Sequence, residues 1–319
     1  MRRLWYVSLF LTLSLCACGK GQEKQVLEEK VSYDEKQIIV NEFEVNEYFD
    51  IPVGESDGEI GVTFVVNGDG PESFCIDDSG KIYILDKLNK KIIIYENGIW
   101  LKDVIIKVPK NDYDLFSIVK RKSGYFVLNR NMGNGGKAVL YTLNEEGERE
   151  TLKVLTDYDS IYIRDMFIDM DENVFLSIWN PTRQKSEIVC INEEESKLEM
   201  WSIDSLQKDT VIFIRANNSY SFDCRKAIPN LAETELAISV CNSTNEETIL
   251  FTIYDSKALY ICRLNFETGS FTYLDSSQDS DKYGGYAYEA TNREFLMNEK
   301  GEVYWMSIYE DRVKMILLN

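Results

Sequence analysis

The sequence predicts an all-β protein, a six-bladed β-propeller of four-stranded antiparallel blades, and two observations carry this prediction. Residues 71–95 (PESFCIDDSGKIYILDKLNKKIIIY) hold three short apolar runs separated by breaks rich in Asp, Asn, Ser and Gly, the pattern of successive antiparallel strands. An aliphatic–aromatic pair such as Ile82-Tyr83 recurs in strong or weak form, with its aromatic residue at positions 83, 126, 175, 220, 260 and 304. The gaps of 43, 49, 45, 40 and 44 residues are typical of propeller blades; the alternative is an all-β chain with evenly spaced hairpins.

The first unit resembles the NHL-repeat propellers over about 25 residues, and the resemblance is faint elsewhere. The residues that match the family motif are Pro71, 74–77, Gly80, Ile82, Tyr83, Asp86, Asn89 and Ile92. Lys90 and Lys91 stand where the family has His-Arg. The resemblance implies a propeller that acts as a non-catalytic binding platform, although a minority of related six-bladed propellers are metal-dependent hydrolases or lyases.

Residues 1–17 are predicted to be a bacterial lipoprotein signal peptide. Two arginines precede an apolar run, residues 4–15, that is too short to span a bilayer. The run ends in Leu15-Cys16-Ala17-Cys18, which has the form of a lipobox with Cys18 as the acylated residue. An ordinary cleaved signal and an uncleaved anchor are the alternatives.

The segment 18–36 after this cysteine is polar and charged, and we expect it to be a flexible tether to a propeller at 37–319. Acyl chains such as palmitate on Cys18 would anchor the protein. The expected location is therefore the extracytoplasmic face of the cell membrane, with the lipid anchor as the contact to the membrane.

Charge and composition exclude several functions. The net charge of −19 becomes −21 once the two arginines of the signal peptide are removed, so nucleic acid is not an expected partner. The chain has no histidine, which removes Ser-His-Asp and Cys-His catalysis and His-ligated zinc. Five cysteines outside the signal region, none in a CxxC pair, are expected to be buried thiols; one or two disulfides are the alternative.

The period assigns strands A to D to each blade. We predict blade 1 at 73–77, 81–86, 91–95 and 103–108, and blade 2 at 115–120, 125–129, 138–143 and 150–155. Blade 3 is predicted at 163–169, 173–178, 187–191 and 198–203, and blade 4 at 211–216, 219–224 and 235–241 with no clear D strand. Blade 5 is predicted at 248–255, 258–264, 270–274 and 285–289, and blade 6 at 294–298, 302–308 and 312–318. Residues 60–66 are expected to complete blade 6 and close the ring, while 37–45 form a strand without an assigned place.

The B–C and D–A loops share one end of a propeller, and cationic residues recur in the B–C loops of blades 1–4 of this acidic chain. We expect this face to bind a protein, peptide or glycan, with anionic ligands included. Mutual salt bridges between solvated loops are the alternative for these charges. The candidate ligand-binding residues are Asp112, Tyr113, Asp114, Arg130, Asp157, Tyr158, Asp159, Trp179, Arg183, Arg225 and Lys226.

We expect neither catalysis, nor a cofactor, nor a bound metal. The alternative is a propeller hydrolase or lyase with a metal held by oxygen ligands that converge from the starts of A strands. Residues 169–173 (DMDEN) have the oxygen spacing of a calcium loop but lack its glycine and distal glutamate, and they fall in an A–B turn. The sequence therefore predicts a binding module and leaves its ligand open.

Overall fold

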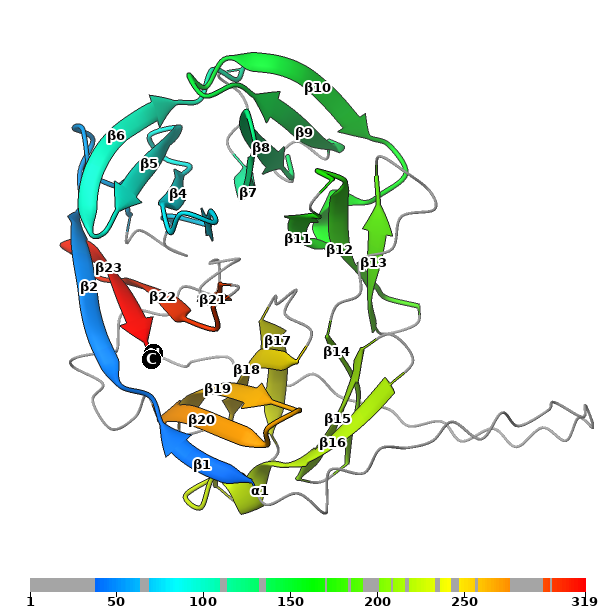
Figure 1. Cartoon of the computed structure of the whole chain (residues 1–319). Helices are drawn as coiled ribbons and strands as arrows, with labels where there is room; N and C mark the ends of the chain where they lie inside the picture. The colour runs from blue at the N-terminus through cyan, green and yellow to red at the C-terminus, as the bar shows by residue number, and fades with distance from the viewer. Residues whose placement is uncertain are drawn as a thin grey trace, which may run out of the picture. The chain divides into compact units, whose positions relative to one another are not determined.

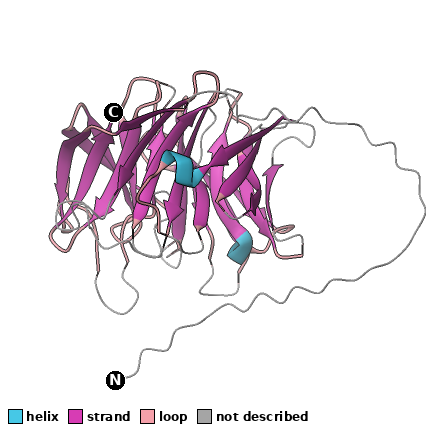
Figure 2. Ribbon diagram, turned by 90° about the horizontal axis from the view of Figure 1, so that it is seen from below, coloured by secondary structure: helices cyan, strands magenta, loops and turns pink. Residues whose placement is uncertain are grey.

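The computed structural model describes residues 38–63, 69–109, 114–131, 136–169, 171–182, 185–191, 201–207, 209–215, 218–232, 236–241, 247–255, 258–275, 295–298 and 300–319. These residues form six β-sheets arranged as the blades of a propeller, which confirms the predicted fold class (Figures 1 and 2). The described helices are one short turn, α1 (Cys224–Ala227), and the 3-10 turn η3 (Ser160–Tyr162). No helix in the described ranges is long and apolar enough to cross a membrane.

Blades 1 and 2 match the prediction closely. Their strands are β3 (Ser73–Ile76), β4 (Ile82–Asp86), β5 (Lys91–Glu96), β6 (Ile99–Ile105), β7 (Leu115–Arg121), β8 (Gly124–Asn129), β9 (Ala138–Leu143) and β10 (Arg149–Leu155). β6 begins at Ile99 rather than at residue 103, because Asn97 and Gly98 both have positive φ (51° and 75°) and form a two-residue hairpin turn. Such a turn lets the fourth strand start immediately after the third.

Blades 3 and 4 divide differently from the prediction. Blade 3 contains β11 (Ile163–Ile168), β12 (Val174–Asn180) and β13 (Lys185–Cys190), and blade 4 contains β14 (Ser202–Gln207), β15 (Thr210–Arg215) and β16 (Asn218–Asp223). The expected D strand of blade 3 at 198–203 is wrong for its described part, because β14 pairs with β15 and is the first strand of blade 4. Residues 192–200 lie outside the described ranges.

Blade 5 takes the strand that we had expected to end blade 4. It consists of β17 (Ala237–Cys241), β18 (Thr248–Tyr254), β19 (Leu259–Asn265) and β20 (Ser270–Asp275). The short N-terminal strand β1 (Ile39–Glu42) is added to it in parallel beside β20, which places the segment 37–45. The D strand predicted at 285–289 falls outside the described residues.

Blade 6 confirms that an N-terminal strand closes the ring but corrects which one. β21 (Phe295–Met297), β22 (Val303–Ile308) and β23 (Arg312–Leu318) pair with β2 (Val45–Pro52), the outer strand. In the predicted closing segment 60–66, Ile60 and Thr63 form only isolated bridges, and 64–66 are outside the description. As the outer strand, β2 has four exposed and three half-buried residues and one buried residue, Ile51, so it is less apolar than the segment we expected.

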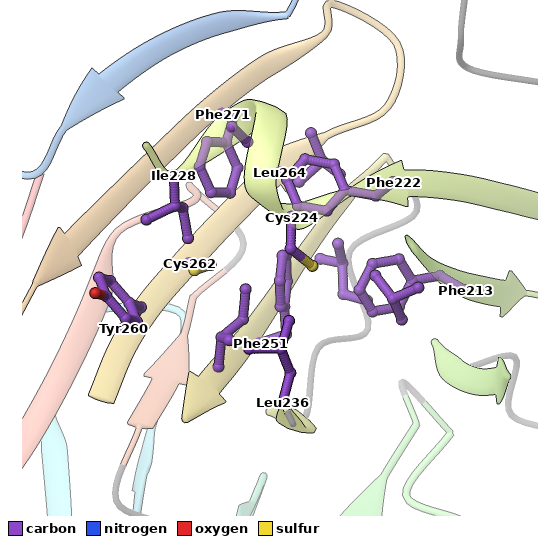
Figure 3. Packing of buried hydrophobic residues seen from close by; sticks show 14 of the residues in the cluster. Phe213, Phe222, Cys224, Ile228, Leu236, Phe251, Tyr260, Cys262, Leu264 and Phe271 are labelled. Atoms are coloured by element: carbon purple, nitrogen blue, oxygen red, sulfur yellow. The ribbon is translucent and has the colours of Figure 1, made fainter. Parts of the chain in front are cut away.

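Apolar side chains fill the interfaces between neighbouring blades. Clusters of this kind join blades 6 and 1, 1 and 2, 2 and 3, 4 and 5, and 5 and 6. Figure 3 shows the cluster between blades 4 and 5, in which Cys224 and Cys262 lie among Phe213, Phe251 and Phe271. None of the five described cysteines is in a disulfide, and Cys75, Cys224 and Cys262 are buried as expected, whereas Cys190 and Cys241 are half-buried. Burial raises the pKa of Cys224 to about 12, so this thiol is an apolar core residue rather than a nucleophile.

Candidate functional site

A group of charged residues, some of them buried, lies where the inner strands β3 and β7 begin. We call Asp69, Glu72, Lys87, Asp114 and Arg130 the β3–β7 cluster. Glu72 and Asp114 immediately precede the first strands of blades 1 and 2, while Lys87 and Arg130 immediately follow the second strands. Because first and second strands are antiparallel, these four residues share one end of the propeller, the end that carries the B–C loops.

The blade 1 half of the cluster is a nearly buried ion triplet. The Lys87 ammonium contacts the carboxylates of both Asp69 and Glu72, and the Lys87 and Glu72 side chains are 9% and 3% exposed. Burial raises the pKa of Glu72 although the charge of Lys87 acts in the opposite direction. Burial also opposes the charge on Lys87, but its two carboxylate partners outweigh this effect and raise its pKa.

The blade 2 half is built around Arg130. Its guanidinium lies 3.4 Å above the centroid of the Phe116 ring, and Nη2 is 3.8 Å from Oδ1 of Asp114. Burial lowers the pKa of Arg130, while the charges of Asp114 and Glu72 oppose that shift. Glu72 and Arg130 are therefore close enough to interact electrostatically across the boundary between blades 1 and 2. The cluster is a single charged unit shared by the two blades.

Outside the cluster, Nε of Arg121 and Nε of Arg312 are buried without a hydrogen-bond partner in the described structure. Three polar atoms in or directly beside the cluster share this property. They are Oε2 of Glu72, Nδ2 of Asn129 and Nε of Arg130. The Asn129 residue is fully buried and Glu72 is 2% exposed. An unmet buried polar group costs about 1–3 kcal/mol, so such atoms are rare in folded proteins and mark strain, an ordered water or a ligand. Glu72 and Arg130 belong to the β3–β7 cluster, and Asn129 directly precedes Arg130 in the sequence.

Asn129 differs from the residues at the end of the second strand in blades 1 and 5, which are aspartates that accept hydrogen bonds from backbone N–H groups. In blade 1, Asp86 at the end of β4 accepts a hydrogen bond from Gly61 N (2.9 Å), and in blade 5, Asp255 after β18 accepts one from Ala232 N (2.7 Å). Asn129 ends β8 and accepts only through Oδ1, from Asn131 N at 3.0 Å. Its NH2 group has no hydrogen-bond partner in the described structure, whereas both carboxylate oxygens of Asp86 and Asp255 accept hydrogen bonds. Asn129 was not among the candidate residues predicted from the sequence, although Asp or Asn at the end of the second strand recurs in blades 1, 2 and 5 and could have indicated it.

Buried hydrogen bonds fix the inner strands beneath the cluster. The Ser73 hydroxyl oxygen accepts from Ile118 N (3.3 Å), which joins blade 1 to blade 2. The Ser117 hydroxyl donates to Asp165 Oδ1 (2.9 Å), which joins blade 2 to blade 3. Ser73, Ser117 and Asp165 occupy equivalent positions on β3, β7 and β11, so they hold the cluster residues above them at a defined separation.

Several predicted site residues lie at this same end. Asp157, Tyr158 and Asp159 precede β11, and Trp179 is the next-to-last residue of β12. Tyr158 packs against the core between blades 2 and 3, and Asp159 accepts from Ile161 N (3.3 Å) as the cap of η3. These two residues thus have structural contacts of their own. Asp112, Tyr113, Arg183 and Cys18 are outside the described residues.

Arg225 and Lys226 do not belong to this end. Both lie in α1, directly after β16, which is the third strand of blade 4 and not the second. Arg225 Nε is 2.7 Å from Asp209 Oδ1, in the turn between the first and second strands, and such turns lie at the opposite end of the propeller. The expectation that they share a loop face with Arg130 is therefore wrong, because the blade boundary was misplaced by one strand.

The acidic segment 169–173 is a turn device rather than a cation loop. Asp169 Oδ1 accepts from Asp171 N (3.0 Å) and Asn173 N (2.8 Å), as Asp77 Oδ1 does from the second and fourth residues after it. Among the residues that the structure describes, no group of three or more Cys, Asp or Glu is placed to hold a metal ion.

Comparison with known proteins shows similarity of fold only. No family model and no curated protein matches the chain. Among solved structures, the chain is similar to a streptogramin B lyase at 11% identity, over 87% of this chain and 98% of that chain, with a TM-score of 0.40. It is also similar to a glucose dehydrogenase (12% identity, 86% and 99%, TM-score 0.46) and to a putative exported protein from Bacteroides fragilis (12%, 84% and 79%, 0.34). Similarity this distant assigns no activity to the chain.

Proposed function

We propose that this chain is a membrane-anchored, extracytoplasmic binding protein whose propeller binds its ligand at the β3–β7 cluster. The lipobox around Cys18 supports the anchor and the location. The unmet hydrogen-bonding atoms of Glu72, Asn129 and Arg130 support the position of the site, because a bound group would satisfy them. The ligand is bound and released without chemical change.

Arg130 offers a test with a matched control on the same blade. Arg130 and Arg121 are similarly buried, at 15% and 17% side-chain exposure, and each pairs with a carboxylate. Each also lies over a phenylalanine ring, Phe116 for Arg130 and Phe126 for Arg121. Arg121 ends β7 and so lies at the opposite end of the blade. Arg130→Gln and Arg121→Gln therefore make the same chemical change at the two ends.

The experiment measures binding of sugars and short peptides to the full chain purified in detergent, by thermal shift and calorimetry. We expect Arg130→Gln to weaken binding of whichever probe binds, and Arg121→Gln to leave it unchanged. The reverse pattern would show that the wrong end was chosen. Mass spectrometry of the recovered probe checks the absence of chemistry, and a converted probe would contradict a purely binding role.

A further inference from the structure

The unmet atoms at the β3–β7 cluster specify the chemistry of their partner. Glu72 Oε2 can only accept a hydrogen bond while ionised, and Asn129 Nδ2 and Arg130 Nε can only donate. A single partner that met all three atoms would have to supply one donor and two acceptor sites. A hydroxyl group has one O–H and two lone pairs, which is this complement.

The charges of the cluster favour an uncharged partner. Asp69 and Glu72 neutralise Lys87 on one side, and Asp114 faces Arg130 on the other. Arg164, on the exposed surface of β11, is near enough to affect Arg130. Counting these six residues gives three cations and three anions, a formal charge of zero. A carboxylate or phosphate ligand would have to displace Asp114 from Arg130, in a chain whose net charge of −19 already repels anions. An amine would compete with Lys87 for the carboxylates of Asp69 and Glu72.

The outer part of the cluster is open to solvent while its floor is buried. Asp69 and Asp114 side chains are 45% and 20% exposed, whereas Glu72 is 3% exposed. A ligand with several neighbouring hydroxyls can bond the exposed carboxylates and extend one hydroxyl to the floor. Resting on the proposed binding function, we propose that the ligand of the β3–β7 cluster is a neutral carbohydrate, held through its hydroxyl groups.

The test uses two substitutions in or beside the cluster, Asn129→Asp and Glu72→Gln, and one control at the opposite end. Asn129→Asp keeps the acceptor for Asn131 N and replaces the unmet donor by an oxygen, as Asp86 and Asp255 already have in blades 1 and 5. Asn144→Asp is the matched control, because Asn144 Oδ1 accepts from Glu146 N and Glu148 N in a turn at the opposite end. Glu72→Gln separately removes the charged acceptor.

The probes are neutral mono- and disaccharides, their uronic acid and amino-sugar analogues, and short peptides, titrated at millimolar concentration into the full chain in detergent. We expect a neutral sugar to bind, and Asn129→Asp and Glu72→Gln each to weaken it about ten- to a hundredfold, with Asn144→Asp unchanged. Circular dichroism and melting curves of each variant identify a folding defect.

The outcomes separate this inference from the proposed function. If peptides bind in an Arg130-dependent way and sugars do not, the carbohydrate assignment fails and the binding site stands. If the uronic acid or amino sugar binds more tightly than the neutral sugar, the argument from charge balance is wrong. If Asn144→Asp weakens binding and Asn129→Asp does not, both the proposed site and its ligand class are wrong. The same conclusion follows if no probe binds.

Discussion

Ile51 of β2 provides the sharpest test of how the ring closes. This residue is fully buried, pairs with Val313 of β23, and belongs to the apolar cluster between blades 6 and 1 that also contains Ile60 and Phe74. Truncation to alanine removes buried carbon atoms from a packed interface and leaves a cavity. Ile51→Ala should therefore lower the free energy of unfolding by about 2–5 kcal/mol.

Ile39 of β1 is the matched control, because it is also an isoleucine in an N-terminal outer strand. Its side chain is 57% exposed, and all four residues of β1 are exposed. Ile39→Ala should change stability by less than about 0.5 kcal/mol. Pairing between β1 and β20 rests on the backbone, so truncating the side chain leaves those hydrogen bonds in place.

Urea unfolding followed by circular dichroism measures the difference. With a slope of about 3 kcal/mol per molar urea, the Ile51→Ala midpoint should fall by on the order of 1 M, while that of Ile39→Ala stays at the parental value. Deletion through Glu42 should likewise be tolerated because the residues of β1 are exposed, whereas deletion through Pro52 also removes the buried Phe43 and the outer strand of blade 6 and should destabilise the whole propeller. Equal midpoints for the two alanine variants would show that β2 does not close the ring.

Three further predictions follow from individual residues. Gly124→Ala should destabilise far more than Gly80→Ala in urea unfolding. Both glycines have positive φ (131° and 86°), which costs alanine about 1–2 kcal/mol, but a Cβ on Gly124 would also lie 2.0 Å from Leu143 O, whereas Gly80 has open space around it. Equal losses would refute the packing argument. Burial raises the pKa of Glu72 above its ordinary 4.5, so the folded state binds more protons than the unfolded state, and the free energy of unfolding falls as pH rises above about 4.5. Glu72→Gln should remove this fall. A pH–stability profile of the variant that superimposes on the parental profile would contradict the prediction. Cys18→Ala should abolish the lipidated, membrane-bound form in detergent fractionation, and persistence of that form would rule out the lipobox.

The number of blades could be predicted from the sequence, but which strand of each blade carries the repeated aromatic residue could not. Phe213 and Tyr220 are directly opposed residues of the hairpin β15–β16, and both carry the aromatic signal that we used to mark second strands. Neighbouring strands of one sheet both favour aromatic residues because such cross-strand pairs stabilise it. In blades 4 and 5 the aromatic residues taken as second-strand markers, Tyr220 and Tyr260, lie in the third strands. The second strands of these blades contain Phe213 and Phe251 instead. Blades 1 and 2 escaped this error because their turn residues separate every strand.

The site was harder to predict than the fold because its chemistry depends on contacts between blades. The sequence pointed to Asp114 and Arg130 through the recurring loop charges, and both lie in the cluster. Glu72 and Asn129 are ordinary polar residues beside predicted strands, and only packing against the neighbouring blade shows that their polar atoms are buried. Whether Arg130 is paired or free likewise depends on Asp114 reaching it from the start of another strand.

Asn129 can be compared with the residues at the equivalent position of other blades, and the comparison bears on function. At the end of the second strand, Asp86 and Asp255 satisfy backbone N–H groups of the chain that enters their blades, so this position ordinarily stabilises the fold. At position 129 the described structure places no such N–H group beside the second side-chain atom, and asparagine leaves a buried donor there without a partner. A buried polar group that costs stability at a position where the other blades have a satisfied one is expected at a functional site. The unmet oxygen of Glu72 and the unmet nitrogen of Arg130 lie at the same end, so three unmet polar atoms are grouped at the boundary between blades 1 and 2.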